Sequence, residues 1–379
     1  MKLPKISEKL STHFEKGKPL HCFSSLFDAV DSFFLTPKTV TMSGSHVRDA
    51  VDMKRIMITV MVALMPALLF GMWNVGYQHF LVTGEGTGFW HCFGYGFLKW
   101  LPLAIVTYIS GLTIEIIFAQ RRGHQVAEGF FVTGFIIPMI MPPDVPLWIV
   151  ALATAFSVLF AKEVFGGTGY NFLNPALVAR AFVFFAYPSV ISGDSVWVSG
   201  ALDAVSGATP LSLALNGSVE QMPSVSEMFV GTIPGSLGET SKIAILLGAI
   251  VLLFTKVASW KIMLSVLAGG WITAAAFHLG GLSPLPGWQH LLMGGFLFGA
   301  VFMATDPVTA AHTNVGKYIY GILVGILAIV IRVVNKGYPE GMMLAILLMN
   351  IFAPLIDYCV VRLTIRRRKV LISRKKIRL

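Results

Sequence analysis

Residues 56–76 read Ile-Met-Ile-Thr-Val-Met-Val-Ala-Leu-Met-Pro-Ala-Leu-Leu-Phe-Gly-Met-Trp-Asn-Val-Gly, a run of 21 residues without a charged side chain. A helix of this length rises about 30 Å, which matches the hydrocarbon core of a bilayer. Comparable apolar runs follow at 98–119, 129–141, 146–164, 175–187, 241–255, 262–280, 289–305, 317–334 and 341–361. With 55% hydrophobic and 13% charged residues, the chain is predicted to be an all-α integral membrane protein with about ten transmembrane helices.

The basic residues predict how these helices are oriented. Nine Lys or Arg residues lie in residues 1–55 and nine more in residues 362–379, and shorter basic turns contain Arg121 and Lys256. Ten spans that start inside place all of these segments in the cytoplasm, as the positive-inside rule requires. We therefore expect a multi-pass protein of a bacterial cell inner membrane, with both termini cytoplasmic. The same rule explains the net charge of +10 without a nucleic-acid partner.

A long loop divides the predicted helices into two sets of five. Residues 188–240 contain five acidic residues and no Lys or Arg, which is typical of an extracytoplasmic segment. Because each half has an odd number of helices, the halves would be two inverted five-helix repeats. The predicted organisation is a cytoplasmic N-terminal segment, a first repeat, the extracytoplasmic loop, a second repeat and a basic cytoplasmic tail, at residues 1–55, 56–187, 188–240, 241–361 and 362–379.

Several ionisable residues fall within or beside the apolar runs. Such side chains cost about 2.5–3.5 kcal/mol on insertion scales, so they usually face a cavity or a partner. Asp306 and Asp357 are the main candidates for a cation path, with Glu163 as a further one. A structural ion pair is the alternative, and the sequence does not separate Na⁺ from H⁺. Arg180 and Arg332 are expected to pair with carboxylates or with partner subunits.

Two predicted cytoplasmic turns are rich in Gly and Asn, at residues 166–175 and 306–314. The side chains of Asn171 and Asn174 could match the donors and acceptors of a planar heterocycle. The alternative is purely local, because Asn174 and Pro175 are suited to the N-cap and first position of a helix. The three cysteines are scattered and form no C-x-x-C pair, so no metal site is predicted.

The loop contains Asp203-Ala-Val-Ser206-Gly207-Ala208-Thr209. This stretch resembles the D-x-x-[S/T]-G-A-[S/T] pattern of proteins that carry FMN through a phosphoester on the last hydroxyl. The small residues Gly207 and Ala208 would expose the Thr209 hydroxyl and leave room for the flavin ring. The pattern therefore predicts a covalent FMN site at Thr209.

The chain as a whole resembles the family formed by the NqrB-type subunits of the Na⁺-translocating NADH:quinone oxidoreductase and the RnfD-type subunits of the Rnf ferredoxin:NAD⁺ complex. The resemblance extends over nearly the whole chain, and the long N-terminal segment favours the quinone reductase. The stretches that carry it are Ser45-His-Val-Arg-Asp49, Asp52-x-Lys54-Arg55, Glu128-Gly-Phe-Phe131, Lys162-Glu-Val-Phe-Gly-Gly-Thr-Gly169, Asn171-Phe-Leu-Asn-Pro-Ala176, Phe184-Phe-Ala-Tyr-Pro188, Ile233-Pro-Gly-Ser236, Met303-Ala-Thr-Asp-Pro307 and Tyr338-Pro-Glu-Gly-Met-Met343.

The resemblance implies a subunit of an enzyme complex that pumps Na⁺ while electrons pass from NADH to quinone. It implies covalent FMN on Thr209, non-covalent riboflavin, five partner subunits (A, C, D, E and F) and a flavin transferase for maturation. Electrons would move from FMN outside to riboflavin near the cytoplasmic turns, and then to quinone. The quinone-linked stretch maps to Gly111 and Glu115, although Leu112 stands where relatives often have a second glycine.

Three alternatives are left open. One is an Rnf-type subunit, another is a flavin-free inverted-repeat channel or transporter, and the third is a structural anchor for soluble redox subunits.

Overall fold

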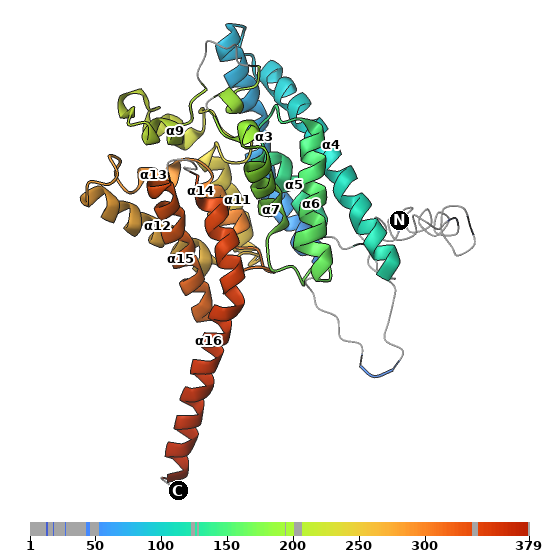
Figure 1. Cartoon of the computed structure of the whole chain (residues 1–379), viewed down its shortest axis with the longest axis vertical. Helices are drawn as coiled ribbons and strands as arrows, with labels where there is room; N and C mark the ends of the chain where they lie inside the picture. The colour runs from blue at the N-terminus through green and yellow to red at the C-terminus, as the bar shows by residue number, and fades with distance from the viewer. Residues whose placement is uncertain are drawn as a thin grey trace.

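The computed structural model describes residues 53–122, 126, 129–193, 195–200, 207–335 and 340–377, together with residues 13, 18, 27 and 43–45. Helices, and no strands, make up the regular structure of this part of the chain. The first half contains α3 (Met53–Thr83), α4 (Phe89–Arg122), α5 (Gly129–Ile140), α6 (Leu147–Ser157) continued by η2 (Val158–Lys162) and η3 (Glu163–Phe165), and α7 (Pro175–Ala186). Figure 1 shows these helices side by side, with α3 and α4 forming the longest pair.

Short helical turns fill the segment between the halves. They are α8 (Pro188–Ile191), η4 (Ser195–Trp197), α9 (Pro210–Leu215), η5 (Val219–Gln221) and α10 (Val225–Val230). The second half contains α11 (Lys242–Phe254), α12 (Trp260–Leu279), α13 (Gln289–Leu292), α14 (Phe296–Phe298), η6 (Gly299–Met303), α15 (Asn314–Val334) and α16 (Met342–Ile377). The basic tail continues α16 as a single helix that projects from the bundle in Figure 1.

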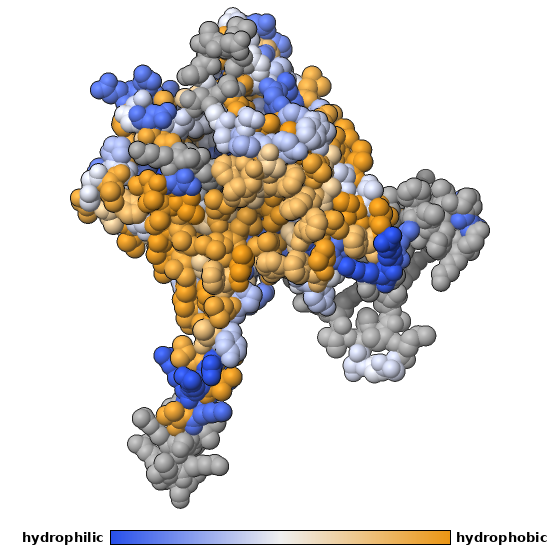
Figure 2. Space-filling view, viewed as in Figure 1, coloured by the Kyte–Doolittle hydropathy of each residue, from blue (hydrophilic) through white to orange (hydrophobic). Residues whose placement is uncertain are grey.

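The expectation of an all-α, multi-pass membrane protein is confirmed. Six helical segments are long and apolar enough to cross a bilayer, and α5, α7 and α11 are shorter apolar helices. Figure 2 shows apolar side chains forming a broad band around the visible face of the bundle, between a polar upper end and the basic part of α16. Such a band is the surface that lipid chains would cover.

Two helix pairings of the first half recur in the second, whereas the extensive contact of α3 with α4 has no comparable counterpart between α11 and α12. In the first half the second helix, α4, packs against the fourth, α6, and the fourth packs against the fifth, α7. The second half repeats this arrangement, with α12 against α15 and α15 against α16. The halves meet through their first helices, α3 and α11, and their fifth helices, α7 and α16.

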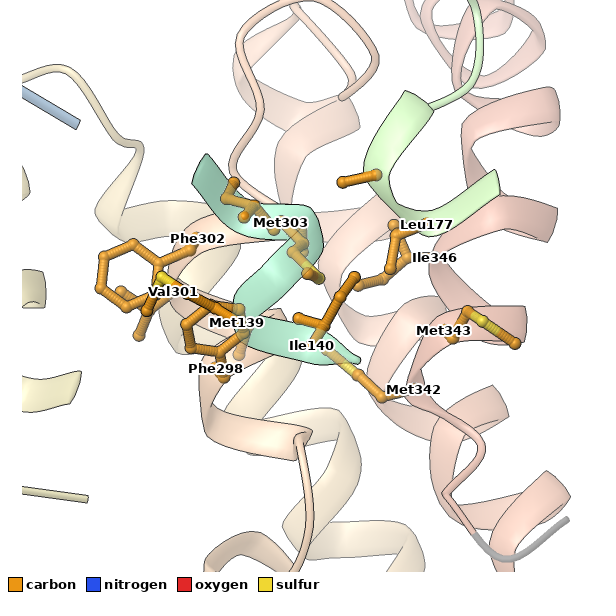
Figure 3. Close-up of a cluster of buried hydrophobic side chains, with 14 of the residues drawn as sticks. Met139, Ile140, Leu177, Phe298, Val301, Phe302, Met303, Met342, Met343 and Ile346 are labelled. Atoms are coloured by element: carbon orange, nitrogen blue, oxygen red, sulfur yellow. The ribbon is translucent and has the colours of Figure 1, made fainter. Parts of the chain in front are cut away.

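The junction of the halves is a packed apolar core. Figure 3 shows side chains from α5 and α7 of the first half facing side chains from α14, η6 and α16 of the second. Those labelled are Met139, Ile140, Leu177, Phe298, Val301, Phe302, Met303, Met342, Met343 and Ile346, and all of them are buried. Their contacts join the two halves of the bundle through closely packed apolar side chains.

Two predicted boundaries are wrong. Residues 77–97, which lie between the predicted helices 56–76 and 98–119, are helical except at 84–88, and aromatic side chains stack between the ends of α3 and α4. The ring centroids of Phe80 and His91 lie 4.1 Å apart, as do those of His79 and Tyr95. The expected continuous helix 289–305 is broken between α13 and α14. Gly294 has φ +56°, which ends regular helix geometry there.

Candidate functional site

Two cavities lie at opposite ends of the bundle. We call the end that carries residues 188–240 the loop face, and the end that carries Arg122, Lys256 and Lys261 the basic face. The cavity on the loop face has a volume of about 330 Å³, and the one on the basic face about 80 Å³. The first volume lies at the lower end of the roughly 300–1,000 Å³ of typical small-molecule sites, and the second lies below that range.

Thr209 lines the loop-face cavity. It is the N-cap of α9, where its side-chain oxygen accepts a hydrogen bond from the Ser212 N–H at 3.2 Å. Pro210 follows at the first helical position, where its missing N–H has no consequence. The sequence thus fixes the Thr209 hydroxyl at the edge of the cavity, with Trp197 among the other lining residues. Gly207 is buried and Ala208 partly buried, while Asp203 and Ser206 lie outside the described residues.

Buried charges surround the same cavity. Arg180 forms an ion pair with Glu340, and its Nη1 atom lies 3.9 Å from the carboxylate of Glu239. The ammonium of Lys242 donates to the carbonyl oxygens of Glu239 at 2.5 Å and Gly294 at 3.3 Å. The expected pairing of Arg180 with a carboxylate is therefore confirmed. Ionic groups with so little water around them exert strong fields on anything bound nearby.

A network of hydrogen bonds fixes the segment that precedes the FMN-like motif. The carboxylate of Asp144, in the turn after α5, accepts bonds from Lys99 Nζ at 2.5 Å, Ser199 Oγ at 3.0 Å and the Gly200 N–H at 3.0 Å. The Ser199 carbonyl lies 2.7 Å from His79 Nδ1, and its hydroxyl lies 2.9 Å from the Tyr95 hydroxyl. We call this set the Asp144 clamp. It joins α3, α4 and the α5–α6 turn to the segment that contains Trp197.

Burial alone would raise the pKa of Asp144, but the hydrogen bonds from Lys99, Ser199 and Gly200 outweigh it and lower that pKa. The carboxylate is therefore ionised at neutral pH. Asp144 was not among the sequence candidates, because its partners are 45 to 56 residues distant along the chain.

The basic-face cavity is lined by both predicted asparagines, by Asp306 and by Lys162. Asn174 caps α7, since its Oδ1 accepts bonds from the N–H groups of Ala176 at 3.0 Å and Leu177 at 3.5 Å. The local alternative for Asn174 is thus confirmed, and its Nδ2 also lies 3.5 Å from Asp306 Oδ2. The glycine-rich turn and Asp306 therefore meet in one site, although 132 residues separate Asn174 from Asp306.

Asp306 is a partly buried carboxylate that receives hydrogen bonds from neutral groups. Its oxygens accept from the Val308 N–H and from the Thr309 hydroxyl, each at 3.1 Å. Burial raises the pKa of Asp306, and these two hydrogen bonds offset only part of the effect. A carboxylate in this position favours either a proton or a cation beside it.

Glu115 forms a buried ion pair with Lys162, which lines the basic-face cavity. Glu163 pairs with Arg122 across 3.2 Å at the end of α4. Gly111 lies beneath an aromatic ring, since a Cβ there would come within 1.9 Å of the Phe130 ring. Glu115 therefore lies close to the basic-face cavity, because its partner Lys162 lines that cavity. Gly111 allows the Phe130 ring to pack directly against α4.

Asp357 occupies a different environment from Asp306. It accepts hydrogen bonds from the His312 N–H at 2.7 Å, the Thr313 N–H at 3.0 Å and the Thr313 hydroxyl at 2.5 Å. These bonds hold the turn that starts α15. Within the described part of the chain, no cluster of three or more His, Cys, Asp or Glu residues could hold a metal ion.

The chain is similar to known proteins over nearly its full length. A family profile described as "NQR2, RnfD, RnfE family" matches residues 40–366. A Chromohalobacter salexigens protein is 48% identical over 95% of this chain and 94% of its own, and one from Ectopseudomonas mendocina is 47% identical over 95% and 97%. A Pseudomonas aeruginosa relative is 45% identical over 97% and 99%, and all three are named as B subunits of the Na(+)-translocating NADH-quinone reductase. The chain belongs to the NQR2, RnfD, RnfE family.

Proposed function

We propose that this chain is the NqrB-type membrane subunit of a Na⁺-translocating NADH–quinone reductase and that it carries FMN as a phosphoester on Thr209. Its partners are then the other five subunits, quinone, Na⁺ and a flavin transferase. It lies in the bacterial inner membrane with the basic face in the cytoplasm. The relatives that share nearly half of its residues over almost the full length support this assignment.

One observation carries the flavin proposal: the Thr209 hydroxyl stands at the edge of a cavity that is large enough for a heterocycle. A flavin held there supplies one- and two-electron transfer. The residues of this chain have separate tasks. Thr209 holds the phosphate end, and Trp197 forms an aromatic wall. The cations Arg180 and Lys242, together with the carboxylates Glu239 and Glu340, line the cavity with compensated charge.

The basic-face cavity is proposed to hold the riboflavin, with Asn171 and Asn174 on its wall. Glu115 is proposed to lie beside the quinone, and Lys162 to hold the Glu115 carboxylate in place. The Na⁺ path is proposed to use Asp306, with Glu163 and Asp357 at the same end of the bundle. Because the packed core of Figure 3 separates the two cavities, a solute would need that core to open, whereas electrons would not.

The test is flavin fluorescence of the chain on a denaturing gel after co-expression with a flavin transferase. We expect a fluorescent band in the parent and in Thr209→Ser, and no band in Thr209→Ala. Ser212→Ala is the matched control, since it removes a neighbouring hydroxyl that lines the same cavity. A fluorescent Thr209→Ala band would refute the attachment site, and a dark parent band would favour a flavin-free transporter.

A further inference from the structure

A second kind of pocket lies on the basic face, at the turn between α11 and α12. It has a volume of about 480 Å³ and adjoins the cavity that contains Asn171 and Asp306, since Val257 and Ala258 line both. Its lining residues are Leu253, Lys256, Val257, Ala258, Ser259, Trp260 and Lys317. Two lysines and no acidic residue contribute to this wall. The pocket therefore has a positive charge that the proposed electron-transfer function does not use.

Lys256 holds an unusual backbone conformation in this turn. Its φ is +58°, and it is the single non-glycine residue with positive φ in the described part of the chain. The Val257 N–H donates to the Leu252 carbonyl and the Lys256 N–H to the Leu253 carbonyl, both at 3.1 Å. This is the pattern of a helix C-terminus at which glycine fits without steric cost. A lysine here places a cation where local geometry alone would favour glycine.

The start of α12 adds to the positive character of the pocket. The Ser259 hydroxyl makes no capping hydrogen bond, so no side chain covers the first turn of this 20-residue helix. The positive end of the helix dipole therefore faces the same space as Lys256 and Lys317. Lys261 is engaged elsewhere, since its ammonium lies 2.7 Å from Asn314 Oδ1. The Asp357 carboxylate is held by the turn at residues 312–313.

Apolar side chains border the pocket on the outside of the bundle. Phe254 is 84% exposed, and Trp260, Leu264 and Val315 are each more than half exposed. Trp260, Leu264 and Val315 belong to helices long enough to span a membrane, and Phe254 ends the shorter apolar helix α11. Their neighbours in a membrane are therefore lipid chains, with Trp260 at the interface. A small soluble anion would contact none of this surface. A phospholipid would place its phosphate at the lysines and its chains along the aromatic and aliphatic side chains.

We propose that the pocket formed by Lys256, Ser259, Trp260 and Lys317 binds the headgroup of an anionic phospholipid. Lys256 and Lys317 contact the phosphate oxygens, and the first turn of α12 provides further N–H donors. Basic pockets between spanning helices on the cytoplasmic side have the chemistry that such headgroups require. The bound lipid would lock the α11–α12 turn against the start of α15, where Lys317 lies. This inference does not depend on the flavin or on Thr209.

The experiment uses the full-length chain purified in detergent, with native mass spectrometry to count bound lipids. The probes are phosphatidylglycerol, phosphatidylcholine with the same acyl chains, and inorganic phosphate. The test variants are Lys256→Gly, which suits the backbone of the turn, and the double variant Lys256→Gly with Lys317→Gln. We expect the double variant to bind phosphatidylglycerol roughly 30-fold more weakly, since each lysine near an anionic headgroup contributes roughly fivefold. Its melting temperature should stay at the parent value.

The control is Arg366→Gln with Arg367→Gln, which removes the same charge from the basic face outside the pocket. It should leave the tight phosphatidylglycerol site unchanged. Parent-like binding by the double variant would overturn the proposal, as would equal binding of phosphatidylcholine and phosphatidylglycerol by the parent. Displacement of the lipid by millimolar inorganic phosphate would also overturn it, because the site would then be one for free phosphate.

Discussion

The Asp144 clamp offers a direct test of how the loop face is held in position. Asp144→Asn keeps the shape of the side chain but removes its charge and one acceptor oxygen. The variant would weaken the bonds from Lys99, Ser199 and Gly200, which measure 2.5, 3.0 and 3.0 Å. These bonds connect helix α4 and the α5–α6 turn to the segment that includes Trp197. We expect that segment to loosen while the helices stay folded.

The size of the effect follows from burial. The Asp144 and Lys99 side chains are 41% and 34% exposed, so their ion pair contributes only about 0–1 kcal/mol. Ser199 is buried, and a hydrogen bond to a charged group contributes about 1.5–3 kcal/mol. Because asparagine still accepts one bond, we expect a net loss of about 2 kcal/mol. At about 1.4 kcal/mol per tenfold change, local opening would become roughly 30-fold more frequent.

Hydrogen exchange followed by mass spectrometry measures this opening. Amides of residues 195–200 should exchange roughly 30-fold faster in Asp144→Asn, while those of α15 keep their parent rates. Glu220→Gln removes an exposed carboxylate from the same loop and should change neither set. Equal exchange at residues 195–200 in parent and variant would refute the clamp. A uniform increase over the whole chain would show general destabilisation instead.

The pH dependence gives a second check on the same residue. Because the folded-state pKa of Asp144 is lowered, its stabilising effect is complete above the unfolded value of about 3.9. That effect is lost as the pH falls through the lower folded-state pKa. The difference between parent and Asp144→Asn should therefore be constant from pH 8 to 5 and should shrink below about pH 4. A difference that disappears already near pH 7 would contradict an ionised Asp144 with a lowered pKa.

Three further predictions concern the basic face. Lys162→Met leaves the Glu115 carboxylate buried without its cation, so we expect the free energy of unfolding to fall by about 3–5 kcal/mol. The melting temperature should fall accordingly, and adding Glu115→Gln should largely restore it. Gly111→Ala places a Cβ against the ring of the neighbouring aromatic residue and should cost about 1–3 kcal/mol in the same assay, with Gly94→Ala at an open position of the same helix as a control. Asp306→Asn should raise the Na⁺ concentration for half-maximal turnover roughly tenfold, because a charged ligand is lost, and Asp357→Asn should change this concentration less than twofold. A larger change in Asp357→Asn than in Asp306→Asn would place the ion beside Asp357.

The presence of helices could be predicted from the sequence where apolar runs lie between polar turns. The positions at which helices end or break could be predicted less well. All ten predicted runs contain helix, since their length and composition leave few alternatives. The break at Gly294 was missed because glycine within an apolar run also suits close helix packing. The helical extension of α3 and α4 into the expected outer loop was missed too. It depends on stacking between His79 and Tyr95, which are distant in the sequence.

The candidate carboxylates show what a sequence leaves undecided about charge in a membrane. An ionised group in an apolar run signals that something compensates it, but the compensating group can be a side chain, a backbone turn or an ion. Glu115 is paired with Lys162, and Glu163 is paired with Arg122. Asp357 accepts hydrogen bonds from two backbone N–H groups of one turn. The hydrogen bonds to Asp306 also come from neutral groups, but they are longer than those to Asp357, at 3.1, 3.1 and 3.5 Å against 2.5, 2.7 and 3.0 Å, and they lie in a cavity wall. Of these four carboxylates, Asp306 is therefore the one at which a bound cation would remove the largest uncompensated charge.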